Sequence, residues 1–394
     1  MHYRSAISVL VGGLFATNVF AADLMQTYME ALANDPQYAS ARAALMAGQE
    51  KSTQGLAKLL PNLSASGSYG RNWYEGLNYN ENKYTIALTQ PVFDWAKFQN
   101  YETSKLQVSI SEAQFAQAQQ DLMMRVSQAY FDILAAEDVV TFAQAQKAAV
   151  AQQLELAKRS FQVGTTTITD THEAQARYNL AEADEITALN DLEVKRTALE
   201  QIIGHPPGSL DPLKKGVKLS APQPNVMATW VSSAESQNYQ VVQYRLSREV
   251  AKRNIKANQA GHMPTVDLVA AYNHTDHDQF MIDTNGGVQS FNTQKMIGLQ
   301  WNIPLFSGFE TTSKVKEAVS LEDKARNDLE ASRRSAAQLA RQSYLGVNNG
   351  LSQVKALEAA EVASLSSLEA NKLGYEVGVR INIDVLNAEQ QVFM

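Results

Sequence analysis

Side chains that could bind a metal ion are most concentrated at residues 274–278, which read His-Thr-Asp-His-Asp. Imidazole nitrogens and carboxylate oxygens are ligands for divalent cations. The segment falls in a polar stretch that we expect to be a loop between two strands, and surface loops often carry such residues without a ligand. We therefore expect no metal site in this segment, and we expect His172 to be an ordinary surface residue.

Other signs of enzyme chemistry are missing from the sequence. It contains no phosphate-binding glycine loop, no glycine-framed nucleophile and no paired-carboxylate site. It also contains no cysteine, which excludes disulfides, thiolate zinc sites and cysteine nucleophiles. We expect neither an enzyme nor a cofactor.

Two aspartates stand out by their spacing. Asp170 and Asp384 each lie six residues after a glycine that follows valine, at Gly164 and Gly378. Each carboxylate could simply be a helix N-cap, which contributes about 1 kcal/mol, or could act as a charged group at the end of a helical hairpin. Both pairs hold one offset, since 378 − 164 and 384 − 170 equal 214. A constant offset over such landmarks indicates a tandem duplication.

The elements that must position these aspartates are long helices. Between Val92 and His205 there is no proline, and the only glycines are Gly164 and Gly204. Because proline and glycine are the strongest local breakers, we predict helices over residues 95–163 and 168–203. The first would be roughly 100 Å long at 1.5 Å per residue. Glycine at the break would supply left-handed backbone at a helix C-terminus, as in a helical hairpin.

The order of elements repeats in the second half. Pro304-Leu305-Phe306 matches Pro91-Val92-Phe93 and again precedes a long stretch without proline. We assign residues 22–205 to the first repeat, 206–225 to a proline-rich linker and 226–394 to the second repeat. The second hairpin stops about 30 residues short of what the first predicts, so we expect a truncated return helix.

Four segments alternate with a period of two, which is typical of strands. They are residues 63–70, 84–89, 266–272 and 297–303, with polar loops expected over 72–82 and 273–292. An apolar face opposite a small or polar face fits an outer-membrane barrel, although an ordinary half-buried sheet alternates in the same way. Four strands cannot close a barrel, and open edges in lipid are not viable. A barrel would therefore be shared between protomers.

The N-terminus supports export. Arg4 precedes a short apolar run and small residues that end at Ala21, which is the pattern of a secretory signal peptide over residues 1–21. The run is shorter than the roughly 20 residues that span a bilayer. The formal net charge of −7 gives no basic surface for nucleic acid.

The long helices are rich in alanine and glutamine, as in residues 113–120. A narrow apolar seam between two polar faces suits a tubular wall one helix thick. It equally suits a plain coiled-coil spacer. The predicted strands favour the tubular wall.

These features together resemble the TolC family of outer-membrane efflux and type I secretion channels. The segments that carry the resemblance are Ala22-Asp23-Leu24-Met25-Gln26, Leu88-Thr89-Gln90-Pro91-Val92-Phe93-Asp94, Ala129-Tyr130-Phe131-Asp132, Phe161-Gln162-Val163-Gly164 with Ile168-Thr169-Asp170, Gly261-His262-Met263-Pro264, and Gly374-Tyr375-Glu376-Val377-Gly378 with Arg380 and Asp384-Val385-Leu386. The resemblance covers essentially the whole chain after the signal peptide.

The resemblance implies a mostly α-helical homotrimer with a membrane β-barrel. Three protomers would share one 12-stranded barrel in outer-membrane lipid of a Gram-negative bacterium, four strands each, above a long antiparallel α-helical barrel in the periplasm. The implied partners are a periplasmic adaptor (membrane fusion protein) and an inner-membrane pump of the RND, MFS or ABC type. The implied docking surfaces are the two tips, Val163-Gly164-Thr165 and Val377-Gly378-Val379.

The resemblance also implies a gate at the tips. Tyr375 would link to Asp170, Arg380 would link to the region of Thr169, and Asp384 would line the aperture. A ring of carboxylates of this kind selects cations.

Two positions depart from the family pattern. Asn387 replaces a second aperture aspartate, and Arg159 stands where the family has a glutamine that helps to bind the tip arginine, so two guanidinium groups would repel there. The alternative function from another class is a soluble periplasmic coiled-coil scaffold or adaptor.

Overall fold

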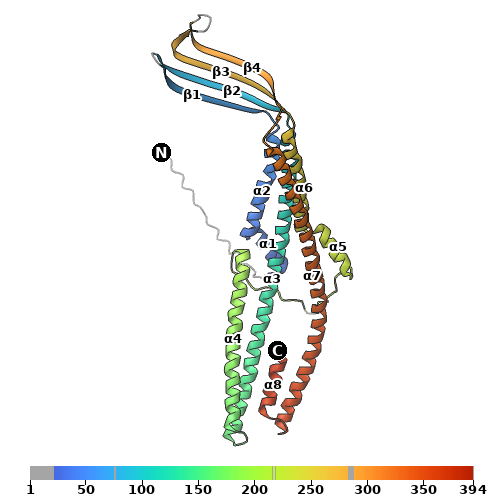
Figure 1. Cartoon of the computed structure of the whole chain (residues 1–394). Helices are drawn as coiled ribbons and strands as arrows, with labels where there is room; N and C mark the ends of the chain where they lie inside the picture. Colours follow the sequence, from blue (N-terminus) through green and yellow to red (C-terminus); the bar gives the residue numbers. More distant parts are fainter. Residues whose placement is uncertain (1–21, 75–76, 215, 218, 283–287, 394) are drawn as a thin grey trace, which may run out of the picture. The chain divides into compact units, whose positions relative to one another are not determined.

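The computed structural model describes residues 22–74, 77–214, 216–217, 219–282 and 288–393 (Figure 1). The predicted signal peptide, residues 1–21, lies outside the described residues. The helices are α1 (Leu24–Asn34), α2 (Pro36–Ala57), α3 (Trp95–Gln162), α4 (Ile168–Ile203), α5 (Met227–Gln237), α6 (Tyr239–Gln259), a 3₁₀ turn η1 (Ala260–His262), α7 (Glu310–Glu376) and α8 (Asn382–Phe393). The strands are β1 (Asn62–Tyr74), β2 (Leu77–Phe93), β3 (Thr265–Ile282) and β4 (Val288–Asn302).

The structure confirms the two long helices predicted for the first repeat. Helix α3 has 68 residues and α4 has 36, and both begin and end within one residue of the predicted bounds. In the second repeat α7 has 67 residues. It contains Gly346 and Gly350 in its interior, so isolated glycines do not break it where proline is absent.

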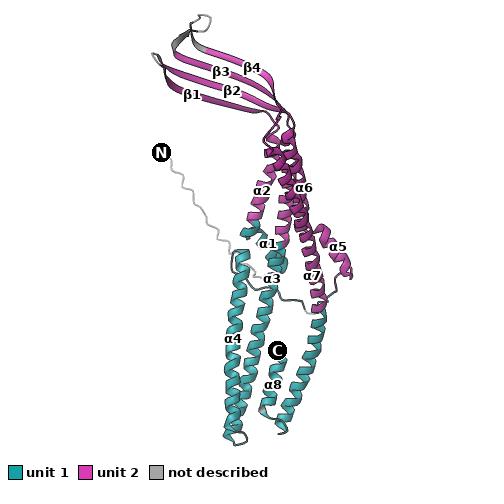
Figure 2. Cartoon of the chain, in the orientation of Figure 1, with its two compact units in different colours: residues 1–38, 121–220, 351–394 teal, residues 39–120, 221–350 magenta. Residues whose placement is uncertain are grey.

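The chain divides into two compact units, and each is built from parts of both repeats (Figure 2). One unit contains residues 1–38, 121–220 and 351–394, which include α4, α8 and the two hairpin tips. The other contains residues 39–120 and 221–350, which include α2, α5, α6 and all four strands. The duplicated halves are therefore not two separate globular domains.

Buried apolar residues follow the spacing of a coiled coil along the hairpins. In α3 they alternate steps of four and three: Leu122, Val126, Ala129, Ile133, Ala136, Val140 and Ala143. In α4 the buried alanines Ala174, Ala181 and Ala188 are seven residues apart. This spacing keeps one seam of each helix against its neighbour. Because alanine is small, the seam is narrow and the flanks of each helix stay open.

An ion pair fixes the bend between α1 and α2. The side chain of Asp35 is only 2% exposed and lies 2.6 Å from a guanidinium nitrogen of Arg125 in α3. The Tyr38 N–H also donates to this carboxylate, at 2.9 Å. Burial raises the pKa of the Asp35 carboxyl, but the Arg125 and Tyr38 hydrogen bonds outweigh burial and hold the pKa below its usual value. The bend between α1 and α2 is thus held by a buried charge pair.

A single antiparallel sheet joins the repeats, in the order β1-β2-β3-β4. The central pair, β2 with β3, brings residues from the two halves of the chain together, as in the 2.8 Å hydrogen bond from Thr85 to Asn273. Strands β1 and β4 lie at the two edges of this sheet. Figure 2 shows the strands as one layer with no helix of the same unit laid across it.

The predicted loops over 72–82 and 273–292 were wrong, because most of these residues continue the strands. The strands have 13, 17, 18 and 15 residues, longer than the alternating segments alone indicated. The polar composition suggested loops, but ladder pairing with neighbouring strands satisfies the backbone of polar residues equally well. Asn80, for example, pairs with Arg71 of β1, and its N–H and amide group also donate to the side chain of Asp278 in β3.

The apolar side chains predicted for one face of the strands are uncovered in the chain. Leu63, Tyr69, Ile297, Leu299 and Trp301 are each at least two-thirds exposed. An exposed apolar face of this extent marks a surface that contacts another partner or a membrane.

Among the described residues, no helix combines the length and the apolar composition that crossing a membrane requires.

Removing the guanidinium at the α1–α2 bend should destabilise the protein. In Arg125→Met the buried Asp35 carboxylate loses its charged donor, and we expect the free energy of unfolding at neutral pH to fall by about 2 kcal/mol. The folded-state pKa of Asp35 is depressed, so the pair stabilises fully above the carboxyl's usual pKa and loses that effect as pH falls through the folded value. The difference in the free energy of unfolding between wild type and Arg125→Met should therefore become smaller at acidic pH.

Circular dichroism melts of detergent-purified protein across the acidic range would measure this gap. Asp35→Asn is the matched control, because it removes the titrating group and should flatten the pH dependence. Equal melting temperatures for wild type and Arg125→Met at neutral pH would contradict the role of the pair.

Candidate functional site at the helical tips

The first tip is a helix C-terminal turn closed by glycine. The Thr165 N–H donates to the Ser160 carbonyl at 2.9 Å, and the Gly164 N–H donates to the Phe161 carbonyl at 3.0 Å. Gly164 has a φ of 77°, in the left-handed region. This pair of hydrogen bonds with a left-handed glycine is the Schellman motif.

The second tip repeats this geometry bond for bond. The Val379 N–H donates to the Gly374 carbonyl at 2.9 Å, and the Gly378 N–H donates to the Tyr375 carbonyl at 3.1 Å. Gly378 has a φ of 81°. Donors and acceptors are again 214 residues from their counterparts, since 379 − 165 and 374 − 160 both equal 214. This agreement supports the predicted duplication.

The aspartates after the tips occupy the third position of their helices, not the N-cap. Asp170 accepts a hydrogen bond from the Thr167 N–H at 3.1 Å, and Asp384 accepts one from the Ile381 N–H at 3.4 Å. The N-cap alternative was therefore wrong by three residues. The carboxylates instead cap from within the first turn, as the acidic member of a capping box does.

Side chains of the second tip surround the aspartates. Tyr375 is half-buried, and this burial raises the pKa of its hydroxyl. The negative charge of Asp170 raises the same pKa further, which indicates that the two side chains lie near each other. The Arg380 side chain covers Gly374 so closely that a Cβ there would meet Arg380 Cγ at 2.7 Å. Its guanidinium lies 3.9 Å from the Asp384 carboxylate.

The remaining predicted residues are distributed around these contacts. Thr169 and Arg159 are exposed near the first tip, and Asn387 is exposed on α8. Within the described part of a single chain, no hydrogen bond joins Arg380 to Thr169. The tips themselves are open to solvent, with Val163 and Val379 each 75% exposed.

One contact was missed by the sequence reasoning. Arg177 on α4 donates from Nη1 to the Gln390 amide oxygen at 2.9 Å and from Nη2 to the Asn387 amide oxygen at 3.1 Å. Both acceptors are on α8, three residues apart. No local sequence feature distinguishes Arg177 from other surface arginines. The only relevant signal was Asn387 in place of the family's aspartate, which indicated that position 387 has an unusual partner.

Helix α8 is also tied to its own hairpin. The Lys372 ammonium in α7 lies 3.0 Å from the carboxylate of Glu389, whose side chain is only 5% exposed. Val385 and Leu386 are buried beside it. The tip region therefore has bonds of two kinds: some lie within a hairpin, and the two from Arg177 join the hairpins.

The polar cluster on β3 does not converge on one point. His274 and His277 are three positions apart in a strand, so they lie on opposite faces. His274 contacts Thr293 at 2.8 Å, and His277 lies 3.8 Å from Glu81. Among the described residues, no group of three or more histidine, aspartate or glutamate side chains is arranged to hold a metal ion.

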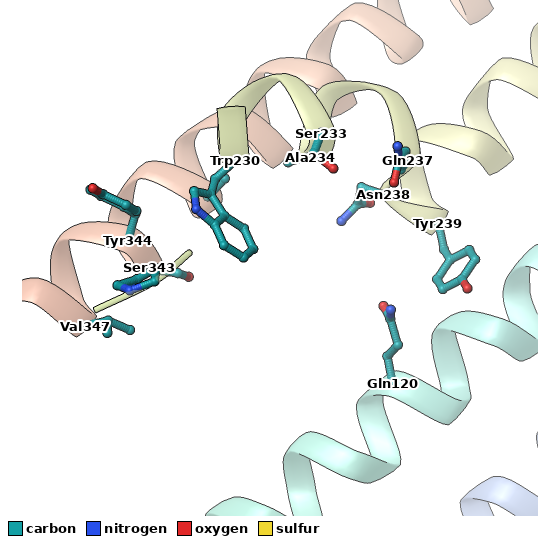
Figure 3. Close-up of a pocket in the computed structure, with 12 residues that line it drawn as sticks. Gln120, Trp230, Ser233, Ala234, Gln237, Asn238, Tyr239, Ser343, Tyr344 and Val347 are labelled. Atoms are coloured by element: carbon teal, nitrogen blue, oxygen red, sulfur yellow. The ribbon is translucent and has the colours of Figure 1, made fainter. Parts of the chain in front are cut away.

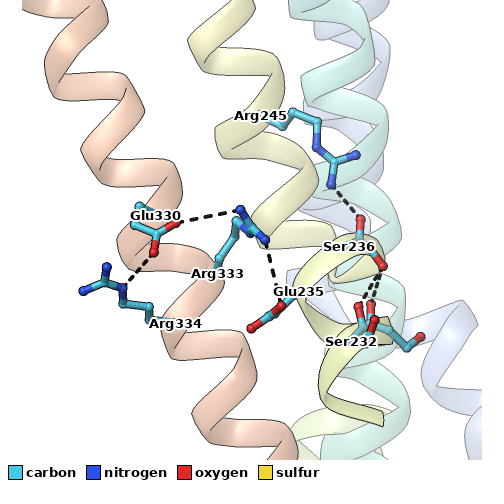
Figure 4. A network of polar contacts seen from close by, with 8 residues as sticks. Ser232, Glu235, Ser236, Arg245, Glu330, Arg333 and Arg334 are labelled. Carbon is cyan, nitrogen blue, oxygen red and sulfur yellow. Dashed lines mark hydrogen bonds and ion pairs between the residues drawn. The ribbon is translucent and has the colours of Figure 1, made fainter. Parts of the chain in front are cut away.

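A hollow of about 590 Å³ lies in the other unit (Figure 3). Its lining residues are uncharged: Gln120, Pro222, Trp230, Ser233, Ala234, Gln237, Asn238, Tyr239, Ala340, Ser343, Tyr344 and Val347. Beside it, the guanidinium of Arg333 in α7 lies 3.8 Å from the carboxylate of Glu330 in the same helix. It lies 3.9 Å from the carboxylate of Glu235 in α5 (Figure 4). Only the Arg333–Glu235 pair of these two reaches α5, and neither brings a reactive group into the hollow.

Comparison with known proteins places the chain clearly. The family model described as "Outer membrane efflux protein" matches residues 27–205 and 230–394. The chain is 33% identical to outer membrane protein TolC of Escherichia coli (strain K12), over 99% of this chain and 81% of that protein. It is 31% identical to the alkaline protease secretion protein AprF of Pseudomonas aeruginosa, over 96% of this chain and 81% of that protein.

Solved structures agree with the fold. The outer membrane protein VceC of Vibrio cholerae superposes with a TM-score of 0.79 at 17% identity, covering 94% of this chain and 90% of that one. A structure of CusC gives a TM-score of 0.77 at 16% identity, covering 94% and 86%. The mostly helical chain with four antiparallel strands thus has the fold of this group of outer-membrane channels.

Substitution of the tip glycine should loosen the tip specifically. A Cβ at Gly164 would meet nothing within 4 Å, so the cost of Gly164→Ala comes only from its left-handed backbone, about 1 kcal/mol. We expect the tip amides of Gly164 and Thr165 to exchange with solvent about fivefold faster. Hydrogen-exchange mass spectrometry measures this change.

Gly346 provides the matched control, because it also has open space around it but lies inside α7. Gly346→Ala should slow exchange locally, since alanine favours a helix by about 1 kcal/mol over glycine. If both substitutions changed the local amide exchange rate in the same direction, the left-handed backbone of Gly164 would not be what stabilises the tip.

Proposed function

The chain belongs to the outer membrane efflux protein family, and from this membership we propose that three copies assemble into one duct that is gated at its helical tips. The chain is an outer-membrane efflux channel related to TolC and to type I protease secretion proteins, and it is not an enzyme. Its assembly, gate residues and partners are the parts that we propose.

The observation that carries the trimer is the unclosed sheet. Four strands expose a broad apolar face, and β1 and β4 end the sheet with unpaired edges. Such edges are not tolerated in lipid, and a closed barrel needs at least about eight strands. Three copies supply twelve strands, and pairing of β4 with β1 of the next copy would close the ring.

The gate is assigned to the cluster described at the tips. Asp384 faces the aperture, with Asn387 one turn further along α8, so each protomer contributes one carboxylate there. Tyr375, whose hydroxyl pKa is raised by burial and then by the charge of Asp170, is assigned to hold the second hairpin against the first. Arg380 is assigned to the same closure together with Thr169, and Arg159, at the end of α3, adds a positive charge close to it.

The exposed tips are assigned to adaptor docking. Val163, Val377 and Val379 project apolar side chains that are two-thirds or more exposed. Apolar groups at a polar tip suit insertion between the helices of a periplasmic adaptor. An inner-membrane pump of the RND, MFS or ABC type would supply the energy, and the cargo would include small toxic molecules and secreted proteins.

The proposal is tested first by assembly. In gently solubilised outer membranes the protein should run as a trimer in native mass spectrometry. A stable monomer in detergent, or a product found only in the soluble periplasmic fraction, would instead favour the alternative of a periplasmic coiled-coil scaffold.

The aperture assignment predicts loss of cation block. Asp384→Ala removes all three carboxylates that we place around the axis, and we expect block by a trivalent cation in planar bilayers to weaken at least tenfold. Asp191→Ala, a change of the same type along α4 and away from the tip, is the control. Undiminished block in Asp384→Ala would place the cation site elsewhere.

The closure assignment predicts a leakier resting channel. Tyr375→Phe combined with Arg380→Ser removes the hydroxyl near Asp170 and the guanidinium near Asp384. We expect the single-channel conductance of the resting state to rise several-fold, because the second tip loses two polar groups to which we assign the closed state. Resting conductance equal to wild type would show that these side chains do not hold the gate.

A further inference from the structure

The guanidinium of Arg177 forms a fork between the two hairpins. Its two terminal nitrogens donate to Asn387 and Gln390, residues one turn apart on the same face of α8. We propose that Arg177 is a latch that holds α8 against α4 in the closed tip and tunes the charge beside the aperture. This inference rests on the proposed gate and names a residue outside the positions assigned to it above.

The latch differs from the other bonds of α8 in what it connects. The Lys372–Glu389 pair joins α7 to α8 and lies inside the second hairpin. The Lys147–Glu185 pair, at 2.9 Å, joins α3 to α4 and lies inside the first. Both pairs can move with their hairpins as rigid parts. The Arg177 bonds cannot, so they must break whenever α8 separates from α4.

The packing around Arg177 is incomplete, so its hydrogen bonds contribute to the contact between α4 and α8. A hollow of about 130 Å³ lies between α4 and α8, lined by Arg177, Asp184, Leu386 and Glu389 among others. Side chains that border the hollow lose dispersion contacts on that side. Val385 and Leu386 of α8 are still buried nearby, so the hydrogen bonds from the charged, planar guanidinium add to apolar packing rather than replace it.

The acceptors give the latch a distinct chemistry. Asn387 and Gln390 are neutral amides, so the bonds do not neutralise the charge of Arg177. Asp184 is the acidic side chain that lines the same hollow, and Glu389 is already paired with Lys372. Arg177 consequently keeps a positive charge about one helical turn from Asp384, and this charge should weaken the attraction of cations to the aperture. The guanidinium stays protonated across the physiological range, so the latch is insensitive to pH.

The test compares Arg177→Met with Lys372→Met in planar bilayers. Both changes remove a cation and keep an unbranched side chain, but only the first breaks a bond between hairpins. For Arg177→Met we expect the resting conductance to rise at least twofold and trivalent cations to block at lower concentration. For Lys372→Met we expect the resting conductance of wild type. Arg177→Lys, which keeps the charge but loses the fork, should raise conductance without changing cation block as strongly.

Cross-linking tests the contact itself. The chain has no cysteine of its own, so Arg177→Cys with Gln390→Cys can be joined by a reducible bis-methanethiosulfonate of arginine length. The joined protein should keep a closed resting state and lose export, and reductant should restore export. Failure of the pair to join within a protomer, or wild-type conductance in Arg177→Met, would overturn the latch.

The outcome separates the latch from the gate on which it depends. If Tyr375→Phe with Arg380→Ser opens the channel and Arg177→Met does not, the gate stands and the latch is wrong. If none of these variants changes the resting conductance, the tip is not the gate and both assignments fail.

Discussion

The arrangement of the chain depends on the hydrogen bonds that the edge strands of its sheet do not make within one chain. Backbone groups at a strand edge must find hydrogen-bond partners, and in lipid they cannot find them in water. Here β1 and β4 leave two such edges, and the apolar side chains of one face find no cover within their own unit. In the proposed assembly, copies of the chain complete this sheet, and their helices would then lie around a common axis.

The helical hairpins meet that demand because their contact seams are narrow. Buried alanines every seven residues let α3 and α4 lie close together, while both flanks of each helix remain polar or open. A helix buried on all sides would belong to a compact bundle. A helix with one thin seam can have a neighbour on each side and solvent on the other two faces, which is what the wall of a duct needs.

The tips concentrate the chemistry of the molecule into a few residues. Each hairpin ends in a Schellman turn and restarts with an aspartate that caps the next helix from its first turn. The same carboxylates therefore fix the local backbone and present charge at the end of the hairpin. We assign the gate to these same residues, so we expect changes at the tip to act on stability and gating together.

Much of this was readable from the sequence, because it depends on near neighbours. The absence of proline set the long helices, the glycines set the turns, and the constant offset of 214 residues showed that the two tips share one design. The packing of α3 against α4 also follows from periodicity, because a seven-residue repeat of apolar residues is a local property of the sequence.

Contacts across long sequence separations were decided only by the tertiary structure. The strands run well past the alternating segments, because strand pairing and contacts with distant side chains, such as that of Asn80 with Asp278, hold polar residues whose local sequence predicts a loop. Arg177 looked like any surface arginine until α8, more than 200 residues away, brought Asn387 and Gln390 to it. Local sequence fixes backbone conformation through sterics and nearby hydrogen bonds, but the partner of a long polar side chain is set by which helices fold side by side.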